Sequence, residues 1–280
     1  MTVDARGTRQ IAALTIAGSD SGGNAGIQAD IRAFHVFGLH ACTVLAALTA
    51  QNPSGVRSVV VQEPAFIEDQ LDAVLEAYEI SALKTGMLAS AEVIAAVAGR
   101  IEKKTAIQKV IDPVMVATSG AKLLRDDAID AMKKLLLPLA TLITPNLPEA
   151  GVLLGHEIRT HEEMALAAEA LSSQFGCAVL VKGGHQAENV AEDVLVENGQ
   201  RTWYATPAIL NPLSTHGTGC SLSAAIAASL AIGRDLRTAV AEGKAYVYES
   251  IRTGISVGPH ATVLGTPSRL DEAIKVVTIR

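Results

Sequence analysis

A glycine-rich segment near the C-terminal end of the chain has the composition of an anion-binding site. Thr215-His216-Gly217-Thr218-Gly219-Cys220 leads directly into an alanine-rich stretch that favours a helix over Ser221–Ile232. Glycines allow a sharp turn and a close approach of ligand to backbone. A tight turn that opens a helix presents free N–H groups, with the positive end of the helix dipole behind them. Such a site suits a phosphate group, although a tight loop around a buried cysteine explains the same residues equally well.

Two further side chains could act on a phosphate held there. Cys220 lies at the first turn of the predicted helix, where a thiol ionises most easily. Lys182 stands between a buried strand and two glycines and can reach a phosphate as a point charge, the alternative being an ordinary surface lysine. His216 is too near Cys220 in the same turn to face it as a catalytic dyad, so we expect it to position the loop.

Asp112 and Glu149 are the candidates for a magnesium site. Carboxylate oxygens suit Mg²⁺, which usually keeps several waters and bridges to nucleotide phosphates. Alternatively, Asp112 shapes a turn before Pro113, and Glu149 stabilises the start of a helix electrostatically. A cation, a lysine and N–H donors are together the parts that phosphoryl transfer needs. The chain has no Walker A pattern, and Gly22–Gly26 does not match the dinucleotide fingerprint.

The hydrophobic pattern predicts strands that alternate with helices, and therefore an α/β fold with a mainly parallel sheet covered on both faces. The expected strands are Ile11–Ala17, Cys42–Ala50, Ala82–Lys84, Val110-Ile111, Leu142–Thr144 and Val179–Lys182, followed by a hairpin of Val194–Glu197 and Arg201–Tyr204 across Asn198-Gly199. The expected helices are Ile27–Phe37, Pro64–Tyr78, Ala91–Lys103, Asp126–Leu137, Leu147–Leu154, one that a Thr160/Glu163 capping box opens and Gly176 ends, Ser221–Ile232 and Leu236–Arg252.

In a sheet of this kind, ligands bind beyond the carboxyl ends of the strands. The polar segments of this chain follow the predicted strands: Gly18–Asp20, Gln51-Asn52, Lys84–Met87, Asp112–Met115, Thr144–Asn146 and Lys182–His185. A solvated loop carries any one of them by chance. Their joint position at one edge predicts a site.

Composition narrows the class of protein. A net charge of −6 and a pI near 5.7 argue against nucleic acid or an acidic membrane as a partner. No apolar stretch approaches the ~20 residues of a membrane helix, and the polar N-terminus lacks the apolar region of a signal peptide. Cys42, Cys177 and Cys220 are too far apart for a disulfide framework or a metal cluster. We expect a cytoplasmic protein with one domain over residues 1–280, of which 1–10 form a flexible tail.

Seven segments together resemble one known family. They are Ala17–Asp30, Thr49–Asn52, Lys84–Leu88, Asp112–Met115, Ile143–Ala150, Val181–His185 and Thr215–Cys220. In this order, over about residues 11–255, they are similar to the bacterial hydroxymethylpyrimidine/phosphomethylpyrimidine kinases of thiamine synthesis, in the ribokinase-like superfamily. The resemblance implies a three-layer α/β/α sandwich, ATP and Mg²⁺ as cofactors, and a homodimer. The implied reaction phosphorylates 4-amino-5-hydroxymethyl-2-methylpyrimidine and then its monophosphate.

The resemblance also implies roles for particular residues. The pyrimidine pocket would include Gly18, Asp30, Gln51, Met87, Val114 and Cys220. The phosphate side would include Asn146 and Lys182 with Gly217 and Gly219 for the nucleotide, Asp112 and Glu149 near Mg²⁺, and Gly217, Thr218 and Gly219 as the anion hole. Gln51 can offer a donor and an acceptor to a ring nitrogen and an amino group.

Two departures from related sequences bear on these roles. Many sugar kinases of the superfamily carry Asp, the usual base, where this chain has Cys220. The pyrimidine branch itself carries Cys, which leaves the identity of the base open. Ser21–Ala25 stands where many relatives have Ser-Gly-Gly-Ala-Gly after one extra residue, a difference that could shift the substrate edge.

Three other functions stay open at this point. A pyridoxal or pyridoxine kinase on the same scaffold would also phosphorylate a hydroxymethyl group on a flat heteroaromatic ring. A non-catalytic sensor would not need to keep the complete phosphoryl-transfer set. A cysteine hydrolase has only Cys220 itself in its favour.

Overall fold

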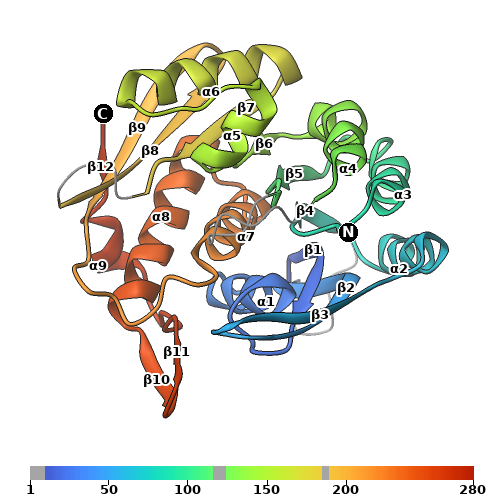
Figure 1. Ribbon diagram of the computed structural model, residues 1–280, viewed down its shortest axis with the longest axis horizontal. Helices are drawn as coiled ribbons and strands as arrows, with labels where there is room; N and C mark the ends of the chain where they lie inside the picture. Colours follow the sequence, from blue (N-terminus) through green and yellow to red (C-terminus); the bar gives the residue numbers. More distant parts are fainter. Residues whose placement is uncertain (1–9, 116–123, 185–188) are drawn as a thin grey trace.

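The computed structural model describes residues 10–115, 124–184 and 189–280, and most of their strands lie in one ten-stranded sheet (Figure 1). The strand order is β12-β9-β8-β7-β6-β5-β4-β1-β2-β3. The bounds are β1 Ala12–Asp20, β2 His40–Asn52, β3 Gly55–Val61, β4 Ile80–Thr85, β5 Gln108–Ile111, β6 Leu142–Ile143, β7 Ala178–Lys182, β8 Val190–Glu197, β9 Gln200–Pro207 and β12 Thr278–Ile279.

The middle of the sheet is parallel. β2, β1, β4, β5, β6 and β7 pair in parallel, while β3, β8, β9 and β12 join antiparallel at the two sides. The carboxyl ends of six strands therefore meet at one edge. The polar segments predicted to form a site follow these ends or form their last residues.

Helices cover both faces of the sheet, as Figure 1 shows, which confirms the predicted α/β class. One face carries α2 Pro64–Ala77, α3 Ala91–Ile101, α4 Asp126–Ala131, α5 Leu147–Leu154 and α6 His161–Phe175, and the other carries α1 Gly26–Val36, α7 Thr218–Ala231 and α8 Leu236–Arg252. α7 contacts β1, β4 and β5 as well as α1 and α8. Its alanines 224, 225, 227 and 228 are fully buried, and such small side chains let a helix lie close to the sheet.

Several local predictions are confirmed. The structure has α5 and α8 at the predicted bounds, and Asn198 and Gly199 take the positive φ angles of a two-residue hairpin turn. Thr160 and Glu163 form the expected capping box, and Gly176 ends α6 in the left-handed region. Each of these features depends on neighbours in the sequence, which is why the sequence could reveal it.

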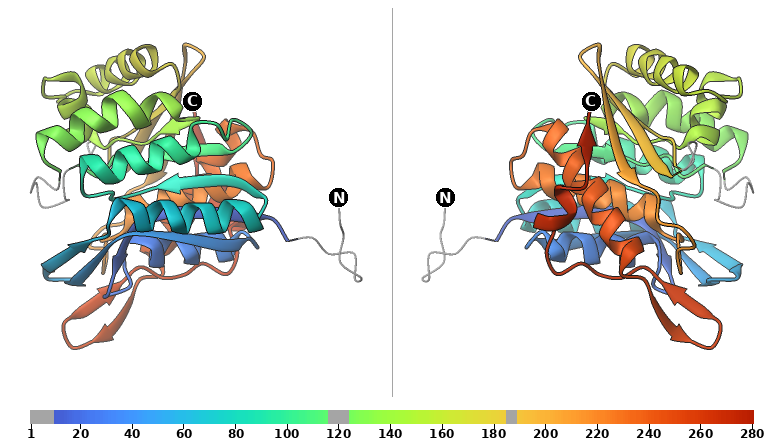
Figure 2. Two further views of the ribbon diagram at one scale, coloured as in Figure 1. Left: turned by 90° about the vertical axis from the view of Figure 1, so that its right-hand side faces the viewer. Right: turned by 90° about the vertical axis from the view of Figure 1, so that its left-hand side faces the viewer.

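Other predictions were incomplete or wrong. The sequence analysis missed β3, β12, the short α9 Asp271–Ile274 and a hairpin of β10 Ile255–Gly258 with β11 Ala261–Val263, which stands out from the body in Figure 2. α7 begins at Thr218 rather than Ser221. Within the described residues, no helix combines the length and hydropathy needed to cross a membrane.

Candidate active site

The predicted phosphate side of the site is built around Asp112, the residue after β5. Its Oδ1 accepts from Lys182 Nζ at 3.0 Å, and its Oδ2 accepts from Ser223 Oγ on α7 at 3.1 Å. A Cβ added to Gly219 would lie 3.5 Å from Lys182 Nζ and 4.0 Å from Asp112 Oδ2. The structure thus brings the predicted lysine, carboxylate and helix start together. Sequence reasoning missed Ser223, which sits inside a uniform alanine-rich stretch.

The ammonium of Lys182 is held in its charged form. Burial lowers the pKa of Lys182, but the carboxylates of Asp112 and Glu149 raise it by more, so that it lies above its usual range. The amide of Gly183, the next residue, donates to Asp193 Oδ1 at 3.1 Å, and Asp193 is paired with buried Lys244 of α8 at 2.5 Å. This second ion pair fixes the chain beside Lys182. His185, part of the same motif, lies outside the described residues.

Glu149 serves first as a helix cap. Its Oε2 accepts from the Asn146 amide at 2.9 Å and its Oε1 from the Met115 amide at 3.1 Å, while Asn146 Oδ1 accepts from the Glu149 amide. Burial raises the pKa of Glu149, partly offset by Lys182. Both carboxylate oxygens of Glu149 already accept hydrogen bonds from backbone amides. Among the described residues, no group of three metal-ligating side chains occurs. Asp112 and Glu149 therefore fit a hydrated Mg²⁺ better than an ion bound only by protein atoms.

The start of α7 packs against the glycine-rich loop after β1. Gly217 is the N-cap with φ of 90°, and a Cβ there would overlap the carbonyl oxygen of Asn24. Only glycine suits both this left-handed conformation and this contact. The Thr218 amide makes a long bond of 3.4 Å to Thr215 O, and the amides of Gly219 and Cys220 lie in the first turn of the helix. The role of Gly217, Thr218 and Gly219 as an anion hole stays a prediction.

The ring side of the site lies across this contact. A Cβ on Gly18 would come within 2.8 Å of Met87 Cε, so these two predicted pocket residues are neighbours. Val114 has a φ of 43°, which a β-branched residue rarely adopts. Strain of this kind is often found at functional positions. The positive φ of Val114 turns the chain between Asp112 and Met115. The Met115 amide in turn donates to Glu149 Oε1.

Asp20, at the end of β1, organises the loop that follows. Its carboxylate accepts from the amides of Gly22, Asn24 and Ala25 at 2.8–2.9 Å. Burial raises the pKa of Asp20, but the nearby imidazole of His216 and the hydrogen bonds from these amides outweigh it and lower the pKa to about 2. The departure at Ser21–Ala25 noted in the sequence is therefore a loop wrapped around one carboxylate.

Gln51, the predicted ring-binding amide, is half-buried at the end of β2. Its Nε2 lies 2.9 Å from His216 Nε2, and Ser21 Oγ bonds its backbone N and O, both at 2.8 Å. The structure therefore joins the predicted substrate side to the loop before α7. His216 holds this junction, which agrees with the loop-positioning role expected for it.

Asp30 is fully buried in α1. Lys84 Nζ donates to Asp30 Oδ1 and Oδ2 at 3.0 and 2.9 Å, and Thr15 Oγ1 donates to Oδ2 at 2.6 Å. Burial lowers the pKa of Lys84, but Asp30 raises it by more. This pair fastens α1 to β1 and β4 beneath the site. A direct contact of Asp30 with substrate stays a prediction.

Cys220 is half-buried on the first turn of α7, with the Gly26 amide donating to its thiol. Burial raises the pKa of Cys220, and Lys84 offsets this only in part. The sequence analysis expected the opposite direction from the position at a helix start. Loss of hydration on burial is the largest influence on the pKa of this thiol.

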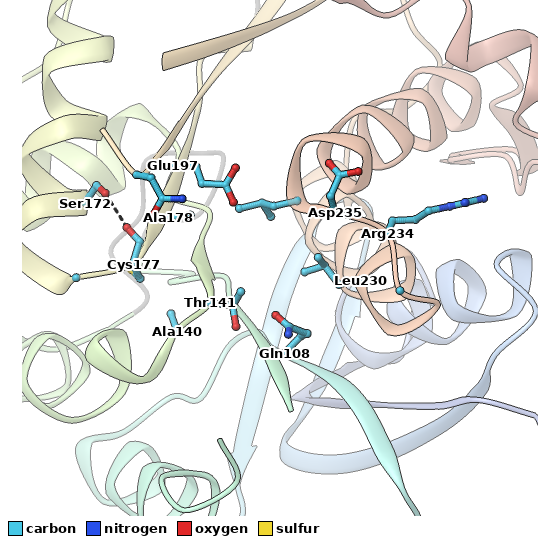
Figure 3. Close-up of a pocket in the computed structure, with 14 residues that line it drawn as sticks. Gln108, Ala140, Thr141, Ser172, Cys177, Ala178, Glu197, Leu230, Arg234 and Asp235 are labelled. Atoms are coloured by element: carbon cyan, nitrogen blue, oxygen red, sulfur yellow. Dashed lines mark hydrogen bonds between the residues drawn. The ribbon is translucent and has the colours of Figure 1, made fainter. Parts of the chain in front are cut away.

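A cavity of about 830 Å³ lies away from this site, at the amino ends of the parallel strands (Figure 3). Its lining includes Gln108 and Ala178, which begin β5 and β7, and Gly233 and Asp235, which follow α7. None of the predicted site residues lines it. The volume of this cavity therefore does not indicate where the active site lies.

Comparison with known proteins places the chain in a family. The model of the family described as phosphomethylpyrimidine kinase matches residues 20–264. The hydroxymethylpyrimidine/phosphomethylpyrimidine kinase of Rhizobium meliloti is 46% identical over 241 residues, 85% of this chain and 90% of that protein. The thiamine biosynthesis bifunctional protein ThiED of Geobacter sulfurreducens is 44% identical over 88% of this chain, which spans only 50% of that longer protein.

Solved structures support the same family. The phosphomethylpyrimidine kinase of Clostridium difficile has a TM-score of 0.76 at 38% identity, covering 86% of this chain and 100% of that one. The ADP complex of Bacillus subtilis pyridoxal kinase has a TM-score of 0.84 at 33% identity, covering 92% and 98%. On the match over residues 20–264 and the shared ribokinase-like fold, this chain belongs to the phosphomethylpyrimidine kinase family and is a phosphotransferase.

Proposed function

We propose that the protein uses ATP to phosphorylate 4-amino-5-hydroxymethyl-2-methylpyrimidine and then the monophosphate, giving the diphosphate. The observation that carries this is the contact between Gly217 and Asn24, which joins the anion hole to the loop beside Gln51. A hydroxymethyl group on a ring beside Gln51 would then face the first turn of α7. The names of the relatives and the ADP complex of a structural neighbour support the substrate class and the nucleotide.

In this reading, each part of the site has one task. Lys182 and the amides of Gly219 and Cys220 stabilise negative charge on the transferred phosphoryl group. Asn146 pairs with Lys182 in a β-bridge, and these two residues bind the nucleotide together. Mg²⁺, which would neutralise phosphate charge, fits the carboxylates of Asp112 and Glu149 through its waters. Gly18, Met87 and Val114 shape the ring pocket, and Cys220 faces the reacting hydroxyl.

Pyridoxal is the second candidate substrate, because a pyridoxal kinase superposes on 92% of the chain. The test is coupled ATP consumption with the pyrimidine alcohol, pyridoxal and pyridoxine at equal concentration. We expect the pyrimidine to have the highest kcat/KM. Faster phosphorylation of pyridoxal, with no turnover of the pyrimidine, would overturn the assignment. A Gln51→Leu variant should weaken the pyrimidine reaction more than the pyridoxal reaction.

We further propose a homodimer of one-domain subunits in the cytoplasm. Support for the dimer comes from edge strand β3, where Val56, Val59, Val60 and Val61 are all exposed. The single sheet from β1 to β12 supports one domain, and the three free cysteines suit a reducing compartment. Sedimentation of the wild type and of Val60→Asp at micromolar concentration tests the dimer. Only the variant should sediment as a monomer.

A further inference from the structure

The side-chain amide of Gln51 can take two orientations, and its surroundings must select one of them. Its backbone is fixed, because Ser21 Oγ both accepts from the Gln51 amide and donates to the Gln51 carbonyl oxygen. The side-chain amide, however, has nearly the same shape when it turns by half a revolution. That turn exchanges a donor for an acceptor in the ring pocket.

His216 is the partner that distinguishes the two orientations. Its Nε2 lies 2.9 Å from Gln51 Nε2, and an amide nitrogen can only donate. The imidazole nitrogen must therefore accept, which directs Gln51 Nε2 toward His216. Gln51 Oε1 then faces Thr49 Oγ1 at 3.2 Å, a weaker partner because the hydroxyl also reaches Ser19 O at 2.9 Å and has only one proton.

The loop before α7 holds the imidazole in place. The His216 amide donates to Ser214 Oγ at 3.3 Å, and the next residue, Gly217, lies against Asn24. Asp20 Oδ2 is 3.7 Å from His216 Nε2, so a proton on this nitrogen would pair with Asp20 and end its acceptor role. The imidazole without a proton on Nε2 is therefore the form that orients Gln51.

We infer that His216 is a positioning residue that fixes the orientation of the Gln51 amide and so sets which ring the pocket accepts. The inference rests on the proposed function. In this orientation, Gln51 has one N–H and one oxygen lone pair left, side by side. A ring nitrogen next to an exocyclic amine, as in a 4-aminopyrimidine, matches both. A 4-oxo ring carries N–H and C=O in the reverse order, and it matches only the turned amide.

Calorimetric binding without ATP, at pH 8 where a typical imidazole is neutral, tests this. The ligands are 4-amino-5-hydroxymethyl-2-methylpyrimidine and its 4-oxo analogue. The wild type should prefer the amino compound at least ~10-fold, because the oxo compound leaves polar groups unpaired. His216→Phe keeps a flat ring without an acceptor, and the preference should fall below ~3-fold. His216→Gln offers a carbonyl acceptor and should restore it.

A further variant separates this role from a merely structural one. His216→Lys offers only donors, so it should draw Gln51 Oε1 toward itself and reverse the preference; this variant also serves if His216→Phe does not fold. Equal weakening of both ligands in His216→Phe, with the preference unchanged, would overturn the inference alone. A wild type that binds neither pyrimidine would overturn the proposed function, and this inference with it.

Discussion

Lys182 and Asp112 form an ion pair of 3.0 Å that spans β6, because Lys182 ends β7 and Asp112 follows β5. Both side chains are largely buried, with 14% and 3% exposure. The two residues are 70 positions apart in the sequence. Their pairing fixes the positive charge of Lys182 directly beside the first turn of α7. The first two predictions follow from this pair.

Replacing Lys182 by Ala should lower turnover by at least ~10-fold, because the transferred phosphoryl group loses a preorganised positive charge. Coupled ATP consumption measures the rate, and circular dichroism reports the fold. Lys275→Ala is the matched control, since Lys275 is exposed and paired with exposed Glu272 near the C-terminus. Unchanged turnover in Lys182→Ala would remove this lysine from the mechanism.

Asp112→Asn and Glu149→Gln should each raise the Mg²⁺ concentration needed for half-maximal activity. Asn keeps the size of Asp112 but loses the charge that attracts the hydrated cation. Glu149→Gln also places an amide NH2 against one of the two backbone amides that the carboxylate accepts from, which should cost about 1 kcal/mol of stability. Activity is measured against Mg²⁺ at saturating ATP. Titration curves that overlay that of the wild type would exclude both carboxylates from the metal's neighbourhood.

Cys220→Ala should lose ~100-fold or more in phosphoryl transfer while still binding ATP. Burial raises the pKa of this thiol, so a base role requires a wild-type rate that is still rising with pH above its ordinary value near 9. The pH profile of kcat/KM, measured with the wild type and with Cys220→Ser, tests this. If Cys220→Ser has near-normal activity and the same profile, the thiol is only part of the pocket wall.

Asp20 should make the protein less stable as pH falls. Its folded pKa of about 2 lies below its ordinary value of 3.8, so its contribution is present above the unfolded pKa and is lost as pH falls toward 2. The shift corresponds to about 2 kcal/mol. Urea unfolding at pH 6 and pH 3 should show a smaller pH dependence for Asp20→Asn than for the wild type. Equal slopes would contradict the lowered pKa.

The proposed second phosphorylation should depend on Lys182 more than the first. Two anions approach each other in that step, so screening by Lys182 and Mg²⁺ matters more. We expect two ATP consumed per pyrimidine and a larger effect of Lys182→Ala on the second transfer. Chromatography with mass detection at long reaction times identifies the products. A reaction that stops at the monophosphate with ample ATP would favour a pyridoxal kinase.

The sequence by itself determined the features that depend on near neighbours. The α/β alternation, the Thr160/Glu163 capping box, the Asn198-Gly199 turn and the glycine-rich opening of α7 all follow from local propensity and spacing. Edge strand β3 was not predicted from the sequence. All seven of its residues are exposed, so it has no buried face. The motifs also carried the family resemblance, because they recur in a fixed order.

Tertiary structure alone decided what those motifs touch. Gln51 meets His216 across 165 residues, and Asp30 meets Lys84 across 54, so no local pattern could pair them. The direction of the Cys220 pKa shift was also out of reach of the sequence. A helix start predicts a lowered pKa, but the partial burial of Cys220 removes hydration from the thiol, and this raises the pKa. Burial depends on how the layers pack, which residue spacing does not encode.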